Sequence, residues 1–130
     1  MGIDLKMLRE RPPRELGNIP PWTPLATATA ARFLQVHPKT LLGWYRAGIG
    51  PEPTSKHEIA KQHFFLCRYL RPGSHLYFVA GILVAWWEHL CLGVDARSYA
   101  EICRQWTETD SGRLTLQMHP KLGLERWGLV

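Results

Sequence analysis

The clearest pattern in the chain is a helical repeat of apolar positions that stops and starts again across the turn Gln35-Val36-His37. Before the turn, small and branched residues share one helical face, namely Ala30, Ala31 and Leu34. Thr27 or Thr29 can cap the start of this first helix, since both carry a side-chain oxygen for the free backbone N–H groups.

A second helix is predicted directly after the turn. Pro38 stands at its first position, where a proline is favourable because the N–H it lacks has no helical partner there. Apolar residues then recur at i, i+3 and i+4, and they form the predicted buried stripe: Leu41, Trp44 and Tyr45. Gly48 ends the helix, and Gly50-Pro51-Glu52-Pro53 prevents its continuation. Residues 25–53 therefore predict a helix-turn-helix.

A β-hairpin is predicted after this unit. Phe64–Leu70 is rich in aromatic and aliphatic residues, Arg71–Ser74 has Pro and Gly in the order of a type II turn, and His75–Phe78 resumes an extended pattern. The segment before it, Thr54–His63, fits either a short helix, with Ser55 and Glu58 at capping-box spacing, or a loop.

A core helix over Val79–Leu92 is predicted from one apolar face, made of Val79, Ile82, Leu83, Trp86 and Leu90. Gly81 interrupts this pattern and weakens the helix by up to about 1 kcal/mol relative to Ala. Trp44 and Trp86 both lie on predicted buried stripes, so we expect them to pack together across the domain.

A last helix is predicted after Gly93, capped by Asp95 or Ser98, with Tyr99, Ile102, Cys103 and Trp106 on one face. It is too short for a long dimerising coiled coil. It therefore either packs back on Trp87 or forms a homodimer or protein-partner surface through Tyr99, Ile102 and Trp106. Beyond Thr109, residues 113–118 alternate like an edge strand, and the last dozen residues resemble an irregular tail.

The N-terminal residues are basic and rich in proline. Met1–Arg11 can make one or two helical turns, whereas Pro12-Pro13 and Pro20-Pro21 bracket a segment that we expect to be an extended linker. This arm is either disordered or becomes ordered on DNA or on a partner protein. Trp22 is expected to anchor it on the domain surface. The predicted organisation is an arm (1–22), a winged helix-turn-helix domain (23–92), and a C-terminal helix and tail (93–130).

The string AARFLQVHPKTLLGWYRAGIGPEP resembles the opening of excisionase-like, MerR-type winged-helix DNA-binding domains. The resemblance is carried by a small-residue helix, a Val in the turn, a Thr-aliphatic pair and a Trp before a Gly: Ala31, Leu34, Val36, Thr40-Leu41, Trp44 and Gly48. The family's wing and following helix are similar to Tyr77-Phe78, Ile82-Leu83 and Ala85-Trp86. Gln35 stands where the family usually has Gly, and His37 where it has a Ser or Thr cap. The resemblance covers roughly residues 23–90 and implies a mainly α fold with a β-hairpin, a winged helix-turn-helix with an added C-terminal helix.

Composition narrows the function classes. The 130 residues carry a formal net charge of +5 and an estimated pI near 9.4, which favours nucleic acid or another acidic partner. The three cysteines form no C-x-x-C pair, so we expect no disulfide framework, no zinc ribbon and a reducing, cytoplasmic location. The N-terminus lacks the apolar core of a signal peptide, and the longest apolar run, residues 76–87, is shorter than the ~20 residues needed to span a bilayer.

Candidate DNA contacts lie on the outer face of the second helix and in the hairpin region. They are His37, Lys39, Thr40, Gly43, Arg46, Lys56, Arg68 and Arg71. The alternative for each is an ordinary solvated basic residue. His57, His63 and Cys67 form a loose cluster whose spacing matches no familiar zinc pattern, so no metal or other cofactor is expected.

No phosphate-binding glycine loop, nucleophile elbow or metalloprotease motif is present, so an enzyme is the least favoured class. The sequence predicts a protein that binds double-stranded DNA, as a transcription regulator or as an accessory factor in recombination or replication. The alternative is a winged-helix protein-interaction module within a larger complex.

Overall fold

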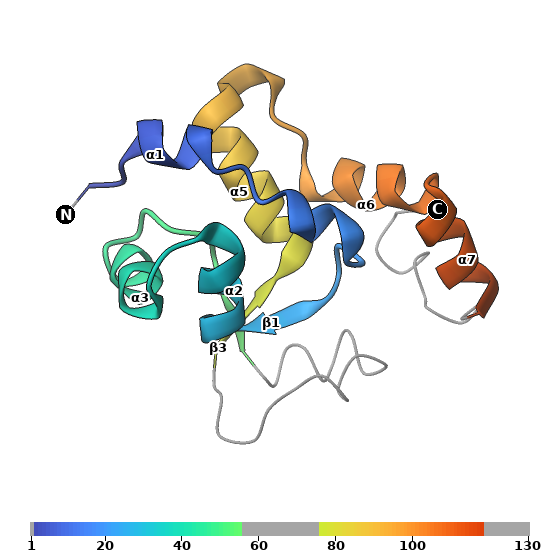
Figure 1. Cartoon of the computed structure of the whole chain (residues 1–130), viewed down its shortest axis with the longest axis horizontal. Helices are drawn as coiled ribbons and strands as arrows, with labels where there is room; N and C mark the ends of the chain where they lie inside the picture. Colours follow the sequence, from blue (N-terminus) through green and yellow to red (C-terminus); the bar gives the residue numbers. More distant parts are fainter. Residues whose placement is uncertain (1, 56–75, 119–130) are drawn as a thin grey trace.

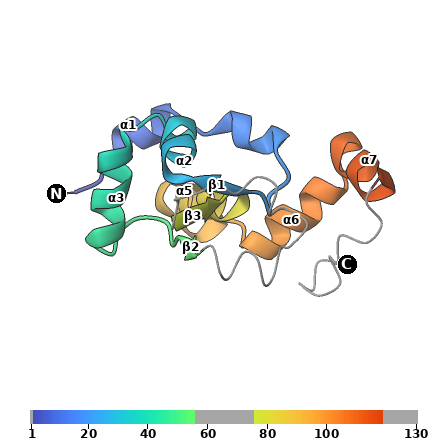
Figure 2. The ribbon, with the colours of Figure 1, turned by 90° about the horizontal axis from the view of Figure 1, so that it is seen from below.

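The computed structural model describes residues 2–55 and 76–118, and it is mainly helical with a small antiparallel sheet (Figure 1). The elements are α1 (Leu5–Glu10), the 3₁₀ helix η1 (Arg14–Asn18), β1 (Pro24–Ala26), α2 (Thr27–Leu34), α3 (Pro38–Arg46), β2 (Thr54–Ser55), β3 (Leu76–Val79), α5 (Ala80–Leu92), the 3₁₀ helix η3 (Gly93–Asp95), α6 (Tyr99–Thr107) and α7 (Asp110–Met118). Helix α5 lies centrally; α1 and α3 lie at one end of the molecule and α6 and α7 at the other, as Figure 2 also shows.

The sheet has the strand order β1-β3-β2, with antiparallel pairing on both sides of β3. Leu25 lies opposite Phe78, and Thr54 lies opposite Tyr77. The predicted return strand of the hairpin is therefore found, because β3 covers residues 76–79, with β2 as its antiparallel partner. The predicted first strand, Phe64–Leu70, and the turn at Arg71–Ser74 lie outside the described residues, as does Thr54–His63 beyond Ser55.

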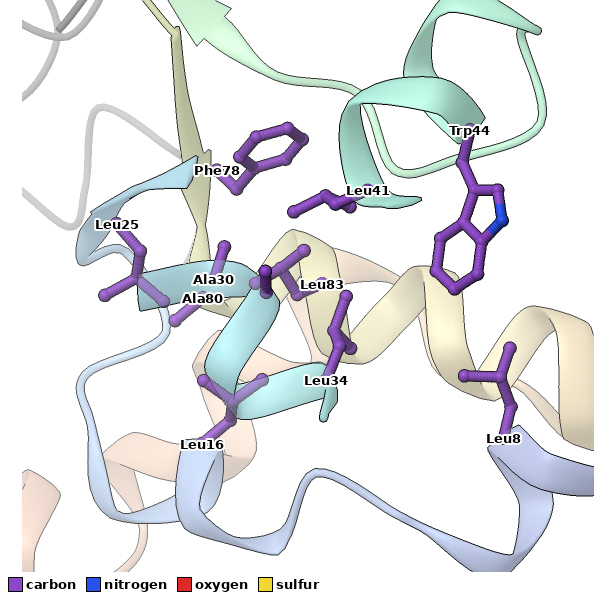
Figure 3. Close-up of a cluster of buried hydrophobic side chains, with 11 residues drawn as sticks. Leu8, Leu16, Leu25, Ala30, Leu34, Leu41, Trp44, Phe78, Ala80 and Leu83 are labelled. Atoms are coloured by element: carbon purple, nitrogen blue, oxygen red, sulfur yellow. The ribbon is translucent and has the colours of Figure 1, made fainter. Parts of the chain in front are cut away.

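The core forms where α2, α3 and β3 meet the start of α5 (Figure 3). Figure 3 shows Leu41 and Trp44 of α3 directed toward Leu34 of α2 and Leu83 of α5. The predicted pairing of Trp44 with Trp86 is confirmed, since their ring centroids lie 5.6 Å apart. Burial of these side chains removes apolar surface from water and is the main term that holds α3 on the domain.

The N-terminal segment packs on the domain. The helical turns predicted within residues 1–11 are found as α1, whereas the prediction of an extended linker or a disordered arm is wrong. Leu8 and Leu16 join the main core at 1% and 2% exposure, and the indole Nε1 of Trp87 donates to the carbonyl of Leu8 at 2.9 Å. Asp4 caps α1 by accepting from the N–H of Met7. Burial of Leu8 and Leu16 therefore holds this segment on the domain, despite the extended backbone that the two proline pairs favour. Trp22, expected as a surface anchor, is fully buried.

Helix α6 is covered within the chain. Ser98 caps it, as predicted, by accepting from the N–H of Glu101 at 3.2 Å. Ile102 and Trp106 are buried, and Trp106 meets Trp22 edge-on with centroids 5.2 Å apart. Of the two expectations for this helix, packing back on the domain is therefore found, with Trp22, and not the predicted Trp87, as the ring that Trp106 meets edge-on. A partner surface through Tyr99, Ile102 and Trp106 is a wrong prediction for the latter two, since this fold already uses them.

Residues 110–118 form helix α7, so the predicted edge strand at residues 113–118 is wrong. Thr109 starts the helix, because its Oγ1 accepts from the N–H of Gly112 at 3.1 Å and its carbonyl accepts from the N–H of Arg113. The predicted tail lies beyond the described residues. Within the described ranges, no helix has the length and apolar character required to cross a membrane.

Candidate nucleic-acid interface

The turn between α2 and α3 is set by Gln35, which adopts the left-handed conformation with φ 58°. The N–H of Val36 returns to the carbonyl of Ala31 at 3.0 Å, which closes the end of α2. The predicted Thr27 or Thr29 cap is wrong: Ala26 is the N-cap of α2, and Thr27 is already in the first turn. The strand β1 ends at Ala26, so the helix begins where the sheet pairing stops.

The start of α3 is fixed by His37 and Pro38. His37 Nδ1 accepts from the N–H of Lys39 at 3.1 Å, so the imidazole takes the capping role that Ser or Thr plays elsewhere. Pro38 occupies the first position, as predicted. The rest of the His37 side chain is exposed to solvent.

The end of α3 is held by three interactions. Gly48 has φ +75°, and the N–H groups of Ile49 and Gly50 both return to the carbonyl of Trp44. The indole Nε1 of Trp86 donates to the carbonyl of Ile49 at 3.1 Å. The helix therefore has a defined start, a defined end and a packed inner face, and its orientation on the domain is fixed.

The outer face of α3 carries Lys39, Gly43 and Arg46. Successive helical residues turn by 100°, so these three positions lie within a narrow stripe opposite Leu41 and Trp44. Lys39 and Arg46 are exposed, whereas Gly43 is partly buried, as is Thr40 on the flank. The structure thus brings three of the predicted contacts together and leaves Thr40 beside them.

The predicted burial of Tyr45 in the stripe of α3 is wrong. Tyr45 is 40% exposed, because the stripe of α3 is centred between Leu41 and Trp44 and Tyr45 falls at its edge. Ile49, just after the helix, is 39% exposed. Neither residue is predicted at the surface from the sequence. For Tyr45, the helical angle relative to Leu41 and Trp44 would have indicated its exposure.

Positive charge without acidic neighbours in sequence is a feature of α2, α3 and the turns around them. Residues 27–50 contain Arg32, Lys39 and Arg46 and no acidic residue. Ion pairs within the described ranges join Glu88 with Arg97, Arg104 with Glu108, and Asp110 with Arg113. All of these lie in α5 and beyond, while Lys39 and Arg46 have no acidic partner in the described structure. The helix-turn-helix unit therefore presents free positive charge.

Two buried groups in α6 have strongly perturbed ionisation. Burial raises the pKa of the Cys103 thiol to about 11, against an opposing contribution from Tyr99. Burial also raises the pKa of the Tyr99 hydroxyl, with the neighbouring thiol acting in the same direction. Both side chains are thus neutral near physiological pH, and neither supplies a nucleophilic anion there.

The predicted contacts Lys56, Arg68 and Arg71 lie outside the described residues, as do His57, His63 and Cys67. Among residues 2–55 and 76–118, no group of three or more His, Cys, Asp or Glu side chains is placed to hold a metal ion. Comparisons of the chain with protein-family models, with curated proteins and with solved structures gave no match.

Proposed function

We propose that this chain binds double-stranded DNA as a winged helix-turn-helix protein, with α3 as the recognition helix and the β2–β3 region as the wing. The observation that carries the proposal is the outer stripe of α3, with exposed Lys39 and Arg46 on either side of the partly buried Gly43, on a helix whose inner face and both ends are fixed. A rigidly held helix with free cations on its outer face suits the major groove.

The dimensions of the stripe agree with this role. Lys39 and Arg46 are two helical turns apart, which is roughly 10 Å along the axis at 1.5 Å per residue, and the major groove is about 12 Å wide. Lys39 at the helix start suits a phosphate, and Arg46 has the donor geometry that reads the O6 and N7 atoms of guanine. Gly43 between them lets the backbone approach the bases closely.

The biological role that fits best is a transcription regulator or an accessory factor in recombination or replication. A second candidate, a protein-interaction module, is favoured by one observation: Tyr45 and Ile49 expose apolar surface beside the basic stripe. Aromatic residues are enriched at protein interfaces. In that case Tyr45→Ala reduces partner binding, while DNA affinity stays weak and independent of Lys39.

The test is DNA affinity measured at several salt concentrations, on random duplex and on the tightest-binding genomic fragment. Lys39→Ala should weaken binding to all sequences alike and lower the salt slope by about one unit, because one phosphate contact is lost. Arg46→Ala should cost about 1–3 kcal/mol on the preferred fragment and less on random duplex. Folded variants that bind DNA as tightly as the parent would contradict the assignment of α3.

A further inference from the structure

A pocket of about 440 Å³ lies where the N-terminal segment meets α5 and α6. Its walls are mainly apolar, and they include Pro12, Pro13, Leu16, Val84, Trp87 and Trp106. This size falls in the range of roughly 300–1,000 Å³ that is typical of small-molecule sites, which also combine apolar walls with a few polar groups. The pocket is separate from the outer face of α3.

The polar wall of the pocket is built from Glu88, Arg97 and Gln105. The Arg97 Nε donates to both oxygens of Glu88 at 3.0 and 3.1 Å, and its Nη2 lies 2.9 Å from Glu88 Oε1. The Arg97 Nη1 donates to Gln105 Oε1. Since an arginine has only donors, the amide of Gln105 must turn its oxygen toward Arg97. The acceptors of this wall are therefore already engaged.

The polar groups left for a ligand are donors. Orientation of the Gln105 oxygen toward Arg97 leaves the amide N–H₂ with no partner in the described parts of the chain. Arg14, which also lines the pocket, is exposed and forms no ion pair within residues 2–55 and 76–118. The wall thus offers a positive charge and free N–H groups but no free carboxylate, because Glu88 is neutralised by Arg97.

We propose that this pocket binds a small, flat organic anion, an aromatic carboxylate in chemical class. The aromatic body packs against Trp87, Trp106 and the prolines, where burial of apolar area and ring contacts provide the affinity. The carboxylate oxygens accept from the Gln105 amide and from Arg14, and these charge-assisted hydrogen bonds select an anion over a neutral or cationic molecule of the same shape.

The test uses two probes with one ring system and opposite charge, 2-naphthoate and 2-naphthylmethylammonium. Each is titrated into ¹⁵N-labelled full-length protein, and the indole N–H signals are followed by NMR. We expect 2-naphthoate to shift the signals of Trp87 and Trp106 and to bind at least tenfold more tightly than the cation. Equal affinity of the two probes, or shifts confined to other indoles, would overturn the proposal.

Two variants separate the anion selectivity from the pocket itself. Gln105→Glu has nearly the same shape and keeps an oxygen for Arg97, but it replaces the free amide donors with a carboxylate oxygen. It should lower 2-naphthoate affinity at least tenfold without lowering the melting temperature. Unchanged affinity in this variant would overturn the donor role of Gln105, and with it the anion class.

Gly17→Phe tests the location, because Gly17 lines the pocket and a Cβ there meets nothing within 4 Å. The phenyl ring should fill the space and abolish binding. Gly2→Phe is the matched control, since a Cβ at Gly2 also meets nothing within 4 Å and Gly2 does not line the pocket. Equal 2-naphthoate affinity in both folded variants would place the ligand elsewhere and overturn the proposal.

Discussion

Substitution of Gly81 by Ala sets local helix preference directly against tertiary packing. Gly81 lies in the first turn of α5, where helix propensity alone predicts that Ala stabilises the protein by up to about 1 kcal/mol. The structure predicts the opposite sign. The N–H of Gly81 donates to the carbonyl of Pro21 at 2.6 Å, so the N-terminal segment lies directly against the helix backbone.

The magnitude follows from what a Cβ at Gly81 would meet. It would lie 2.7 Å from Tyr99 Cε2, 2.8 Å from Pro21 Cβ and 2.9 Å from the Pro21 carbonyl oxygen. Carbon atoms in good contact stand at about 3.5–4.0 Å, so both neighbours must move. Overpacking of this kind costs about 1–3 kcal/mol, which exceeds the propensity gain. We expect a net loss of about 1–2 kcal/mol in the free energy of unfolding.

The assay is equilibrium unfolding in urea, followed by circular dichroism. Gly17→Ala is the control, because its new Cβ meets nothing within 4 Å and the change should lie within about 0.5 kcal/mol of the parent or be slightly stabilising. A Gly81→Ala protein as stable as the parent, or more stable, would refute the close packing of Pro21 and Tyr99 on α5.

Three further predictions follow from particular contacts. Trp86→Phe loses the N–H donor to the Ile49 carbonyl and part of the contact with Trp44, so amide hydrogen exchange of residues 47–50 should become faster. Trp87→Phe loses the hydrogen bond to the Leu8 carbonyl, so exchange in α1 should become faster instead. The reverse pattern would contradict these pairings. Burial raises the pKa of the Cys103 thiol from 9.0 to about 11, so the neutral thiol contributes fully to the free energy of unfolding below pH 9, and this contribution, about 2–3 kcal/mol at most, is lost as the pH rises toward 11. In urea unfolding between pH 9 and 11, Cys103→Ala should therefore lose less stability than the parent. An equal loss of stability with pH in the two proteins would show that the thiol does not contribute. Truncation after Gly93 uncovers Trp22, so the shortened chain should melt lower and bind an apolar dye, and an unchanged melt would show that α6 is dispensable.

Apolar periodicity predicts α2, α3 and α6, because each has one apolar face that packs on the domain. Helix α5 is also predicted, although its apolar residues lie on most of its sides. The contact between Trp44 and Trp86 is predicted in the same way, since each is the largest residue on its buried stripe. The exposure of Lys39 and Arg46 follows from the same pattern, because they lie on the side of α3 opposite its buried residues. These are features in which local pattern and tertiary packing agree.

The errors arose where one local signal concealed another. At the N-terminus, the proline pairs favour extended backbone, whereas Leu8 and Leu16 are buried in a core that includes Leu83 of α5, which lies far along the chain. At residues 113–118, polar and apolar alternation resembled a strand, while Thr109 supplied a helix start that outweighed it. The turn at Gln35 adopts a positive φ without glycine, which sequence preference disfavours and the packing of α2 against α3 imposes.

The small-molecule pocket could not have been found from the sequence. Its walls come from residues 12–21, α5 and residues 97–109, and only the fold brings them together. The Glu88–Arg97–Gln105 arrangement likewise joins the middle of α5 to the loop before α6 and to α6 itself. No local spacing rule predicts such a set, because its members share no single helix face or strand.

The most direct test of DNA binding by α3 compares two double variants with the same net charge. Lys39→Gln with Arg46→Gln removes the free cations of α3, and Arg104→Gln with Arg113→Gln removes two ion-paired cations from α6 and α7 at the other end of the molecule. Affinity for a duplex is measured by fluorescence anisotropy across a salt series, with folding checked by circular dichroism. We predict that the α3 variant loses about two units of salt slope and at least tenfold in affinity, while the control variant remains close to the parent. Equal losses in the two variants, or none in either, would contradict the assignment of α3 as the DNA-binding helix.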